Sequence, residues 1–397
     1  MYPHPPMAQP PRIHIVLLGD LEEHSVRECC QGAAEYFATR PGIDFDPWGT
    51  YPGRGARLTL ADLQRADGLL VSAASLQILG IHPAQLRRPH VFYLAPRKRA
   101  PATTVQLDES WIGRMAAEHL IARGYRHLAY FAPRDADWSQ PRGDGFRAEA
   151  SAHGLTVIES SALGHTGAVY RSHRRRGSTT DLHLALQALP VPCGIFAGHD
   201  IAACYLVQAA RDLGIRVPAH LAVVGADDDP IANAAAGLAL STVRLPFREV
   251  GWQAAAMLDR KVQGKTTRNP RPFPPIGVIT RTSTHAFMTP DPLLRRAQAI
   301  VEHRRREDRR LSVTALVREL RTTDVTLAQR FRRHLRTTPA AYILQRRIEY
   351  AKELLREGRM NVEEVAATCG FHDCSYFGAV FKRVTGTTPG SWRPARG

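Results

Sequence analysis

The stretch AATCGFHDCSYFGAVFKRVTGTTPGSW, residues 366–392, decides how the C-terminal quarter of this chain is interpreted. Its first residues complete a helix for which Asn361 is a suitable N-cap, and a Gly-Phe pair then ends that helix. Asp373 caps a second helix, in which Phe377 and Phe381 recur four positions apart and so lie on one face. Two short helices joined by a tight turn predict a helix-turn-helix motif.

The same plan occurs about fifty residues earlier in the chain. Ser312 caps a helix with apolar residues on one face, and Thr323 caps the next helix, in which Phe331 lies fifty positions before Phe381. The sequence therefore predicts an internal duplication, with a long helix between the copies to hold them at a fixed spacing. The two helix-turn-helix motifs and that helix are predicted at residues 312–336, 361–384 and 339–357.

Residues 366–393 closely follow the signature of the AraC/XylS family of transcription regulators. That family places Ala and Gly-Phe around the turn, Tyr-Phe in the helix, Phe-Lys after it, then Gly-x-Thr-Pro and a final aromatic-Arg pair. Residues 347–355 also resemble the family pattern. One departure is Arg321, where the first turn usually has Gly; Arg fits there if the turn avoids a positive φ. The resemblance implies a DNA-binding transcription regulator.

Basic residues are concentrated in the same region. Residues 287–397 contain 22 Lys and Arg against 12 Asp and Glu, a net charge of +10, whereas the first 286 residues carry +6 of the total of +16. A basic domain joined to a nearly balanced one indicates a polyanionic partner. With the motifs, this predicts binding of double-stranded DNA in the major groove, where a helix can distinguish all four base pairs.

The second helix of each motif is expected to read the DNA, because its apolar stripe faces the domain core. By motif position the first reading helix presents Asp324, Val325, Ala328 and Gln329, and the second presents Cys374, Ser375, Gly378 and Ala379. The expected phosphate clamps, each with a solvated helix charge as the alternative, are Arg332, Arg333, Lys382 and Arg383. Because the second helix offers mostly small side chains, we expect the first to supply more of the direct base contacts and the second to dock and position.

The chain from residue 12 to about residue 259 alternates short apolar runs with longer amphipathic stretches. The runs begin at Ile13, Gly68, His90, His127, Cys193 and Leu221. Short buried runs separated by helices are typical of βαβ units and parallel sheets. At least six such strands over some 215 residues favour two α/β lobes over one. The predicted fold is therefore a two-lobed α/β core followed by an all-α double helix-turn-helix domain.

Several motifs, in order along residues 12–285, resemble the periplasmic-binding-protein-like core of LacI-type regulators and sugar-binding proteins. The matching runs include residues 105–108, 119–131, 142–146, 192–202, 213–228, 240–243 and 281–284. A LacI-type core followed by an AraC-type module is the arrangement of the xylose operon regulators, and residues 32–36 also resemble that subgroup. The resemblance implies a flexible N-terminal tail, a two-lobed ligand-sensing domain and a DNA-binding domain, at residues 1–11, 12–286 and 287–397.

The implied ligand lies in the cleft and is of the size of a sugar. Neutral polyols are held by planar charged side chains, because carboxylates accept from pairs of hydroxyls and Arg donates in a fork. By motif position the residues expected in the cleft are Asp108, Arg142, His199, Asp200 and Asp227, with Trp138 and Trp111 as candidate stacking platforms. His199 stands where the family commonly has Asn or Thr. Two alternatives stay open: Asp108 and Asp228 as helix caps, and the tryptophans as core residues.

Together the two resemblances imply a transcription activator that senses a sugar, xylose or a related pentose. They also imply a homodimer that contacts RNA polymerase. The sequence contains no catalytic, cofactor-binding or zinc-spacing motif, so we expect no enzymatic activity, no cofactor and no metal. It also lacks a secretory signal and a membrane-length apolar stretch, which predicts a cytoplasmic protein. The alternatives are an enzyme tethered to DNA and a ligand-free platform for dimerisation or partner binding.

Overall fold

The fold is described from a computed structural model and divides into two compact units. The first comprises residues 1–109 and 246–275, and the second residues 110–245 and 276–397, so the chain passes between them three times. The predicted tail and the predicted boundary at residue 286 lie outside the described residues. These are 12–47, 59–94, 103–133, 136–160, 178–284, 291–307, 311–335, 337–357, 360–385 and 387–392.

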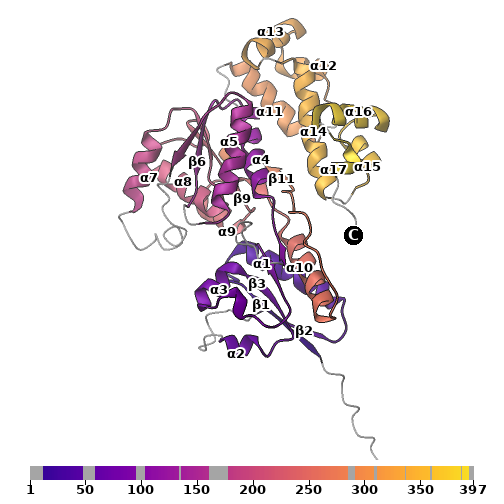
Figure 1. The fold of residues 1–397 in the computed structure, drawn as a ribbon. Helices are drawn as coiled ribbons and strands as arrows, with labels where there is room; N and C mark the ends of the chain where they lie inside the picture. Colours follow the sequence, from indigo (N-terminus) through magenta and orange to yellow (C-terminus); the bar gives the residue numbers. More distant parts are fainter. Residues whose placement is uncertain are drawn as a thin grey trace, which may run out of the picture. The chain divides into compact units, whose positions relative to one another are not determined.

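The first unit is built on a parallel sheet with the strand order β2-β1-β3-β4-β5. Three of its strands, β1, β2 and β3, are labelled in Figure 1. Its strands are β1 Ile13–Leu18, β2 Ile43–Asp46, β3 Gly68–Ser72, β4 His90–Tyr93 and β5 Thr104–Val105. Its helices are α1 His24–Ala38, α2 Leu60–Leu63, α3 Ala73–Leu79 and α10 Phe247–Val262, with a 3₁₀ turn at Pro83–Gln85. The strands β1 and β3 are buried on both faces, which explains their nearly continuous apolar sequence.

Helices α1 and α10 pack closely although more than 200 residues separate them. A Cβ atom at Gly32 would lie 1.9 Å from the carbonyl oxygen of Arg248, and one at Gly251 would lie 1.9 Å from that of Cys29. The two helix backbones therefore touch at a pair of glycines, where no larger residue fits. This contact holds the segment that returns from the second unit against the first sheet.

The second unit contains a sheet with the order β11-β10-β9-β8-β6-β7, parallel except for β11 against β10. Its strands are β6 His127–Phe131, β7 Val157–Ser160, β8 Cys193–Phe196, β9 Leu221–Ala226, β10 Ser241–Arg244 and β11 Gly277–Ile279. Its helices are α4 Glu109–Ala122, α5 Ser139–Ala152, α7 Ser178–Gln187, α8 Asp200–Asp212 and α9 Pro230–Ala236, with a 3₁₀ turn at Thr282–Thr284.

Alternate residues of these strands face the two layers of helices. Ile195 and Val223 pack in one core with α7, α8 and α9. On the other face, Tyr130 and Phe196 stack against Phe146 of α5, with ring centroids 5.4 to 6.2 Å apart. Burial on both faces is the reason that β8 and β9 are apolar at every position.

The second unit also contains the C-terminal helices (Figure 1, orange to yellow). They are α11 Pro292–Glu307, α12 Val313–Leu320, α13 Asp324–Leu335, α14 Pro339–Glu357, α15 Val362–Thr368, α16 Cys374–Thr385 and α17 Pro389–Trp392. The long helix α14 contributes to two separate cores. Tyr342 and Ile343 pack with α11, α12 and α13, whereas Ile348 and Leu355 pack with α15 and α16.

The predicted fold class is confirmed. Each of the six apolar runs contains a strand, and both helix-turn-helix motifs and the helix between them are present. The strands that sequence reasoning did not single out include β2 and β7, which are only partly buried and carry charged residues. An edge strand that is half exposed has no continuous apolar run, so periodicity does not distinguish it from a loop.

Candidate functional site

The two reading helices, α13 and α16, begin as the sequence predicts. The backbone N–H of Thr326 donates to Thr323 Oγ1 at 3.2 Å, and that of Tyr376 donates to Asp373 Oδ1 at 2.5 Å. The supporting helices α12 and α15 are capped by Ser312 and Asn361. All four predicted N-caps are therefore confirmed, and each satisfies a backbone donor that the helix itself cannot pair.

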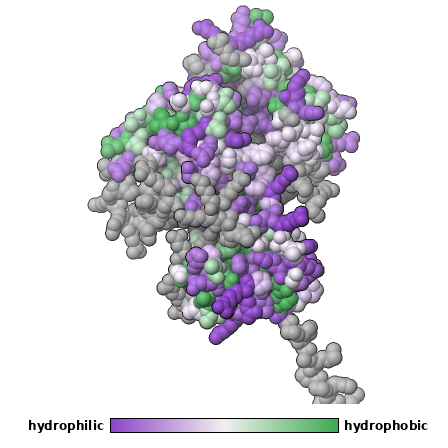
Figure 2. All heavy atoms as spheres, in the orientation of Figure 1, coloured by the Kyte–Doolittle hydropathy of each residue, from purple (hydrophilic) through white to green (hydrophobic). Residues whose placement is uncertain are grey.

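The faces predicted to read DNA point away from the domain core. In α13 the core side is formed by the fully buried Leu327 and Phe331, and in α16 by Phe377 and Phe381. Figure 2 shows mainly hydrophilic residues over α13, at the top of the view. Ala328 and Gly378 are half-buried, and the other predicted contact residues are exposed: Asp324, Val325, Gln329, Arg332, Arg333, Cys374, Ser375, Ala379, Lys382 and Arg383.

The turn of the first motif corrects one expectation. Arg321 was expected to fit if the turn avoided a positive φ, but its φ is +53° and its ψ is +50°. Its backbone N–H donates to the carbonyl of Arg318, so this left-handed residue ends α12 as a Gly normally does. The corresponding residue of the second motif is Gly370, with a φ of +79°. The first turn therefore adopts the family geometry in spite of its side chain.

Two residues of this surface were missed by sequence reasoning. Arg330 binds the buried carboxylate of Asp291 at 2.8 and 2.9 Å, which ties α13 to the start of α11 and holds the pKa of Asp291 below its usual value. Tyr376 is 57% exposed on α16, beside the predicted contact Ser375. The sequence does not show that Tyr376 is exposed, because an aromatic residue in a largely apolar helix is expected in the core.

The candidate ligand residues of the second unit are positioned by the crossing of α4 and α5. A Cβ atom at Gly113 of α4 would lie 1.8 Å from the carbonyl oxygen of Arg142, and one at Gly145 of α5 would lie 1.8 Å from that of Ser110. The backbones of the two helices are therefore in direct contact, and Arg142 itself is one of the contacting residues. Such a contact leaves the start of α5 little freedom to move.

Four of the predicted ligand residues form one cluster. The guanidinium of Arg142 lies over the ring of Trp138, 4.7 Å from its centroid, and donates from Nη1 to the carbonyl oxygen of Gly198 at 2.6 Å. The same Nη1 is 3.7 Å from Asp227 Oδ1. The rings of Trp138 and His199 lie 5.0 Å apart. The buried guanidinium of Arg142 thus contacts both a planar ring and a carboxylate.

His199 has a structural role that accounts for its position in the family motif. Its Nδ1 accepts from the backbone N–H of Ala202 at 3.2 Å, so the ring is the N-cap of α8. Asn and Thr, the residues common at this position in LacI-type regulators, are also good N-caps. Burial and the neighbouring Arg142 charge lower the pKa of His199 to about 3. The ring is therefore neutral at pH 7, and with Nδ1 accepting, Nε2 carries the proton.

Asp200 is fully buried at the first turn of α8. One carboxylate oxygen accepts from the backbone N–H of Asp229 at 2.9 Å, and a Cβ atom at Gly225 would lie only 2.0 Å from the other oxygen. Burial, followed by the charges of Asp227 and Asp228, raises the pKa of Asp200 well above its ordinary value. Gly225 is therefore required for the carboxyl group of Asp200 to fit beneath the end of β9.

The turn after β9 has an unusual backbone. Asp227 and Asp228 have φ values of +110° and +60°, although neither is a glycine. The turn is held by its own polar contacts: the backbone N–H of Asp227 donates to Val243 O at 2.9 Å, and that of Asp228 donates to Thr242 Oγ1 at 3.2 Å. Strain of this kind persists only where the surroundings over-determine the conformation, and it is frequent at binding sites.

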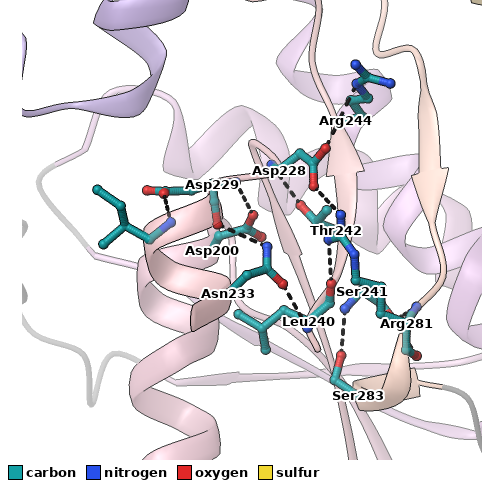
Figure 3. A network of polar contacts seen from close by, with 11 residues as sticks. Asp200, Asp228, Asp229, Asn233, Leu240, Ser241, Thr242, Arg244, Arg281 and Ser283 are labelled. Carbon is teal, nitrogen blue, oxygen red and sulfur yellow. Dashed lines mark hydrogen bonds and ion pairs between the residues drawn. The ribbon is translucent and has the colours of Figure 1, made fainter. Parts of the chain in front are cut away.

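Asp228 is not a helix cap, which was one of the alternatives. Asp229 caps α9, because its carboxylate accepts from the backbone N–H of Ile231 at 2.8 Å. Asp228 instead accepts from Arg281 Nη2 at 2.6 Å, and Arg244 Nε lies 4.0 Å from it (Figure 3). Sequence reasoning missed Arg281 as a site residue; it was only part of a matching motif.

Two candidates remain, Asp108 and Trp111. Asp108 belongs to the first unit, half-buried directly before α4, and its backbone N–H donates to Phe273 O at 2.8 Å. Trp111 is 37% exposed on α4, with its ring edge toward Trp392 at 6.0 Å. It therefore lies against the C-terminal helices and not in the cluster around Arg142, so its candidacy as a stacking platform is wrong.

Within the described ranges, no group of three or more His, Cys, Asp or Glu side chains is arranged to hold a metal ion. The same part of the chain contains no helix long and apolar enough to cross a membrane.

The chain resembles known proteins along both of its parts. The family model of a periplasmic binding protein-like domain matches residues 117–284, and that of a helix-turn-helix domain matches residues 316–395. The xylose operon regulatory protein of Haemophilus influenzae is 30% identical over 295 residues, 73% of this chain and 74% of that protein. The protein of the same name from Escherichia coli K12 is 27% identical over 302 residues, 74% of each chain.

A solved structure, that of the xylose-binding transcription activator xylR, matches this chain in fold. The match covers 96% of this chain and 98% of that one, with a TM-score of 0.59 and 24% sequence identity. The shared fold therefore extends over both the α/β core and the C-terminal helices.

Proposed function

This chain belongs to the family of the xylose operon regulatory proteins and is a DNA-binding transcription regulator, and from that premise we propose that it activates transcription in response to a monosaccharide. The proposed effector is xylose or a related pentose, bound by the periplasmic-binding-protein-like domain. The proposed partners are a second copy of this chain, operator DNA and RNA polymerase. Because operator DNA and RNA polymerase are its proposed partners, the proposed location is the cytoplasm.

The cluster around Arg142 is the observation that carries the sugar proposal. A buried guanidinium offers donors in a fixed fork, Asp227 offers paired acceptors, and Trp138 offers a flat apolar face. A pyranose presents hydroxyls around its rim and C–H groups on its faces, so it needs this combination. The neutral His199 adds a donor. Asp108 is proposed as a further acceptor from its position in the sequence motif.

For DNA, we assign direct base contacts mainly to the first reading helix. Gln329 is exposed on α13 and has both a donor and an acceptor, the pair that recognises adenine. The exposed residues of α16 include Cys374, Ser375 and Ala379, which are small. The proposed role of α16 is therefore to dock and position, with Lys382, Arg383 and their counterparts in α13 on the phosphates.

Calorimetry of the full chain with D-xylose, L-arabinose, D-ribose, D-glucose and L-rhamnose tests the sensor. We expect D-xylose or another pentose to bind, and Arg142→Met and Asp227→Asn each to weaken it by roughly 10- to 100-fold, because each removes charged hydrogen bonds. Arg147→Met is the matched control: Arg147 lies on the same helix, but binds Asp144 and Glu159 at the surface. Binding unchanged in both test variants would place the sugar elsewhere. No binding of any sugar would favour the ligand-free platform, and turnover would favour an enzyme.

DNA recognition is tested by selecting bound duplexes from a random-sequence pool with the full chain. The selected duplex is then titrated with and without the sugar that binds. The proposal requires that the sugar change either the affinity or the geometry of the complex, because a ligand shifts an equilibrium only through differential binding. A response to no sugar would overturn the proposed regulation while leaving DNA binding intact.

A further inference from the structure

The C-terminal helices contact the α/β lobe of the second unit through a small, well-defined surface. Lys352 of α14 is the centre of it, with a side chain that is only 10% exposed. Its Nζ lies 2.9 Å from Glu349 Oε1 of the same helix and 3.4 Å from Glu118 Oε1 of α4. It also lies 5.5 Å from the ring centroid of Trp392, a ring that contacts both Trp111 of α4 and Phe381 of α16. Helix α14 contacts β11 as well.

Lys352 bridges two domains that sequence resemblance treats as separate. Glu118 and Trp111 come from the sensing domain, and Glu349, Lys352 and Trp392 come from the DNA-binding domain. Burial and the nearby Glu349 carboxylate raise the pKa of Glu118, whereas Lys352 lowers it. The Lys352 side chain is 10% exposed, whereas those of Glu118 and Glu349 are 49% and 25% exposed. Moving either carboxylate away leaves the buried ammonium less well compensated. The contact is therefore sensitive to small shifts of α4.

The elements beneath this surface are connected to the strained turn after β9 by hydrogen bonds. Arg281, which binds Asp228, also donates to Leu240 O from Nη1 and to Ser241 Oγ from its backbone N–H, both at 2.8 Å (Figure 3). Ser241 Oγ lies 2.6 Å from Thr284 Oγ1, and Thr284 Oγ1 lies 2.8 Å from His119 Nε2.

These contacts are buried and continuous. Ser241 and Thr284 are fully buried, and His119 is 7% exposed on α4. His119 directly follows Glu118, the carboxylate that reaches Lys352. Arg123, directly after the end of α4, donates to Thr284 O at 3.0 Å and to Thr280 Oγ1 at 2.8 Å. Each step joins elements of regular structure, namely β10, the 3₁₀ turn at Thr282–Thr284 and α4, so the contacts form one contiguous network from the turn at Asp227 to α4.

We propose that Lys352 is the positioning residue through which the sensing domain sets the placement of the DNA-binding domain. The inference rests on the proposed function, which puts the sugar against Asp227. In this arrangement occupancy changes the Asp227–Asp228 turn, the Arg281–Ser241–Thr284–His119 contacts carry the change to α4, and Glu118 conveys it to Lys352. Because α14 contributes to the cores of both helix-turn-helix motifs, both reading helices move with Lys352.

The test uses full-length Lys352→Met and Trp111→Ala, which disrupt the surface from opposite sides. The matched control is Lys265→Met, an exposed lysine of the first unit bonded to Gln263. For each, the affinity for D-xylose is measured by calorimetry, and the affinity for the selected duplex is measured with and without saturating D-xylose. Hydrogen exchange of α4 and α14 is followed without either ligand, and thermal melting verifies that each variant is folded.

We expect the affinity of both variants for D-xylose to stay within about threefold of the wild-type affinity. The ratio of their DNA affinities with and without D-xylose should fall toward one. Without ligands, both should exchange faster in α4 and α14, and Lys265→Met should match wild type throughout. An unchanged D-xylose effect in both variants, with a responsive wild type, would overturn the inference and leave the proposed function standing. A wild type that does not respond to any sugar would defeat the proposed function, and this coupling with it.

Discussion

The two helix-turn-helix motifs are copies of one plan, but they do not superimpose residue for residue. The reading helices begin at Asp324 and Cys374, an offset of 50. The supporting helices are capped by Ser312 and Asn361, an offset of 49. The second turn is therefore one residue longer. The duplication continues past the reading helices, where Thr338 and Thr388, again 50 apart, cap α14 and α17.

The longer turn of the second copy places an additional aromatic residue in the core. Phe371 follows the left-handed Gly370, is 8% exposed and lies 5.0 Å from the ring of Phe377. The first copy has only the half-buried Thr322 between Arg321 and the cap Thr323. The comparison teaches that the apolar stripe and the N-cap determine where a reading helix sits, and that the turn can vary in length and in the residue at its left-handed position.

Separate cores predict that the copies unfold separately. Phe331→Ala and Phe381→Ala each remove a fully buried ring and should lower the free energy of unfolding by about 3–5 kcal/mol. Hydrogen exchange should show α13 losing protection in the first variant and α16 in the second. Tyr376→Ala, at an exposed ring, should cost less than about 1 kcal/mol. Equal loss in both helices from either substitution would mean that the copies form one cooperative unit.

The unequal reading faces predict unequal losses of DNA affinity. Gln329→Ala should weaken binding of the selected duplex by about 10-fold or more, because a bidentate base contact contributes about 1–3 kcal/mol. Ser375→Ala should weaken it less than about threefold. Titrations by fluorescence anisotropy at fixed salt measure both, since phosphate contacts make affinity salt-dependent. A larger loss for Ser375→Ala would show that the assignment of the two helices is reversed.

A side chain at Gly370, the left-handed residue of the second turn, should lower the stability of the domain. Gly370→Ala places a Cβ at a φ of +79° and should destabilise the domain by about 1–2 kcal/mol, as measured by chemical denaturation. Gly390→Ala is the control, because Gly390 lies in α17 with open space around it and a Cβ there should be neutral or mildly stabilising. Equal stability of both variants would mean that the turn relaxes at no cost.

Arg321 occupies the same position in the first turn. Its substitution by Gly should give the smallest change in the free energy of unfolding, and this change should be a gain in stability. Arg321→Gly relieves the left-handed strain of about 1–2 kcal/mol but adds about 0.5–1 kcal/mol of chain entropy to the unfolded state, so a gain of about 0.5–1 kcal/mol is expected. Arg321→Lys should leave stability unchanged. If Arg321→Gly instead weakened DNA binding with no gain in stability, the guanidinium itself would be a phosphate contact.

Much of the fold could be predicted because its signals are local. The caps Ser312, Thr323, Asn361 and Asp373 each bond within three residues, and the stripes of α13 and α16 repeat every four. Parallel strands buried on both faces are visible as apolar runs. Arg321 marks the limit of such local signals: the condition stated for it, a turn without a positive φ, is not met, since its φ is +53°.

The sequence by itself thus determined the fold class, the six apolar strands, the helices of both helix-turn-helix motifs and the identity of most ligand candidates. Only the tertiary structure decided which of those candidates meet. Asp228 pairs with Arg281, 53 positions away, and Glu118 meets Lys352 at a separation of 234. It also assigned His199 to the cap of α8 and placed Trp111 against Trp392. Burial and pairing between distant segments depend on how whole elements pack, and no pattern within a single segment records that.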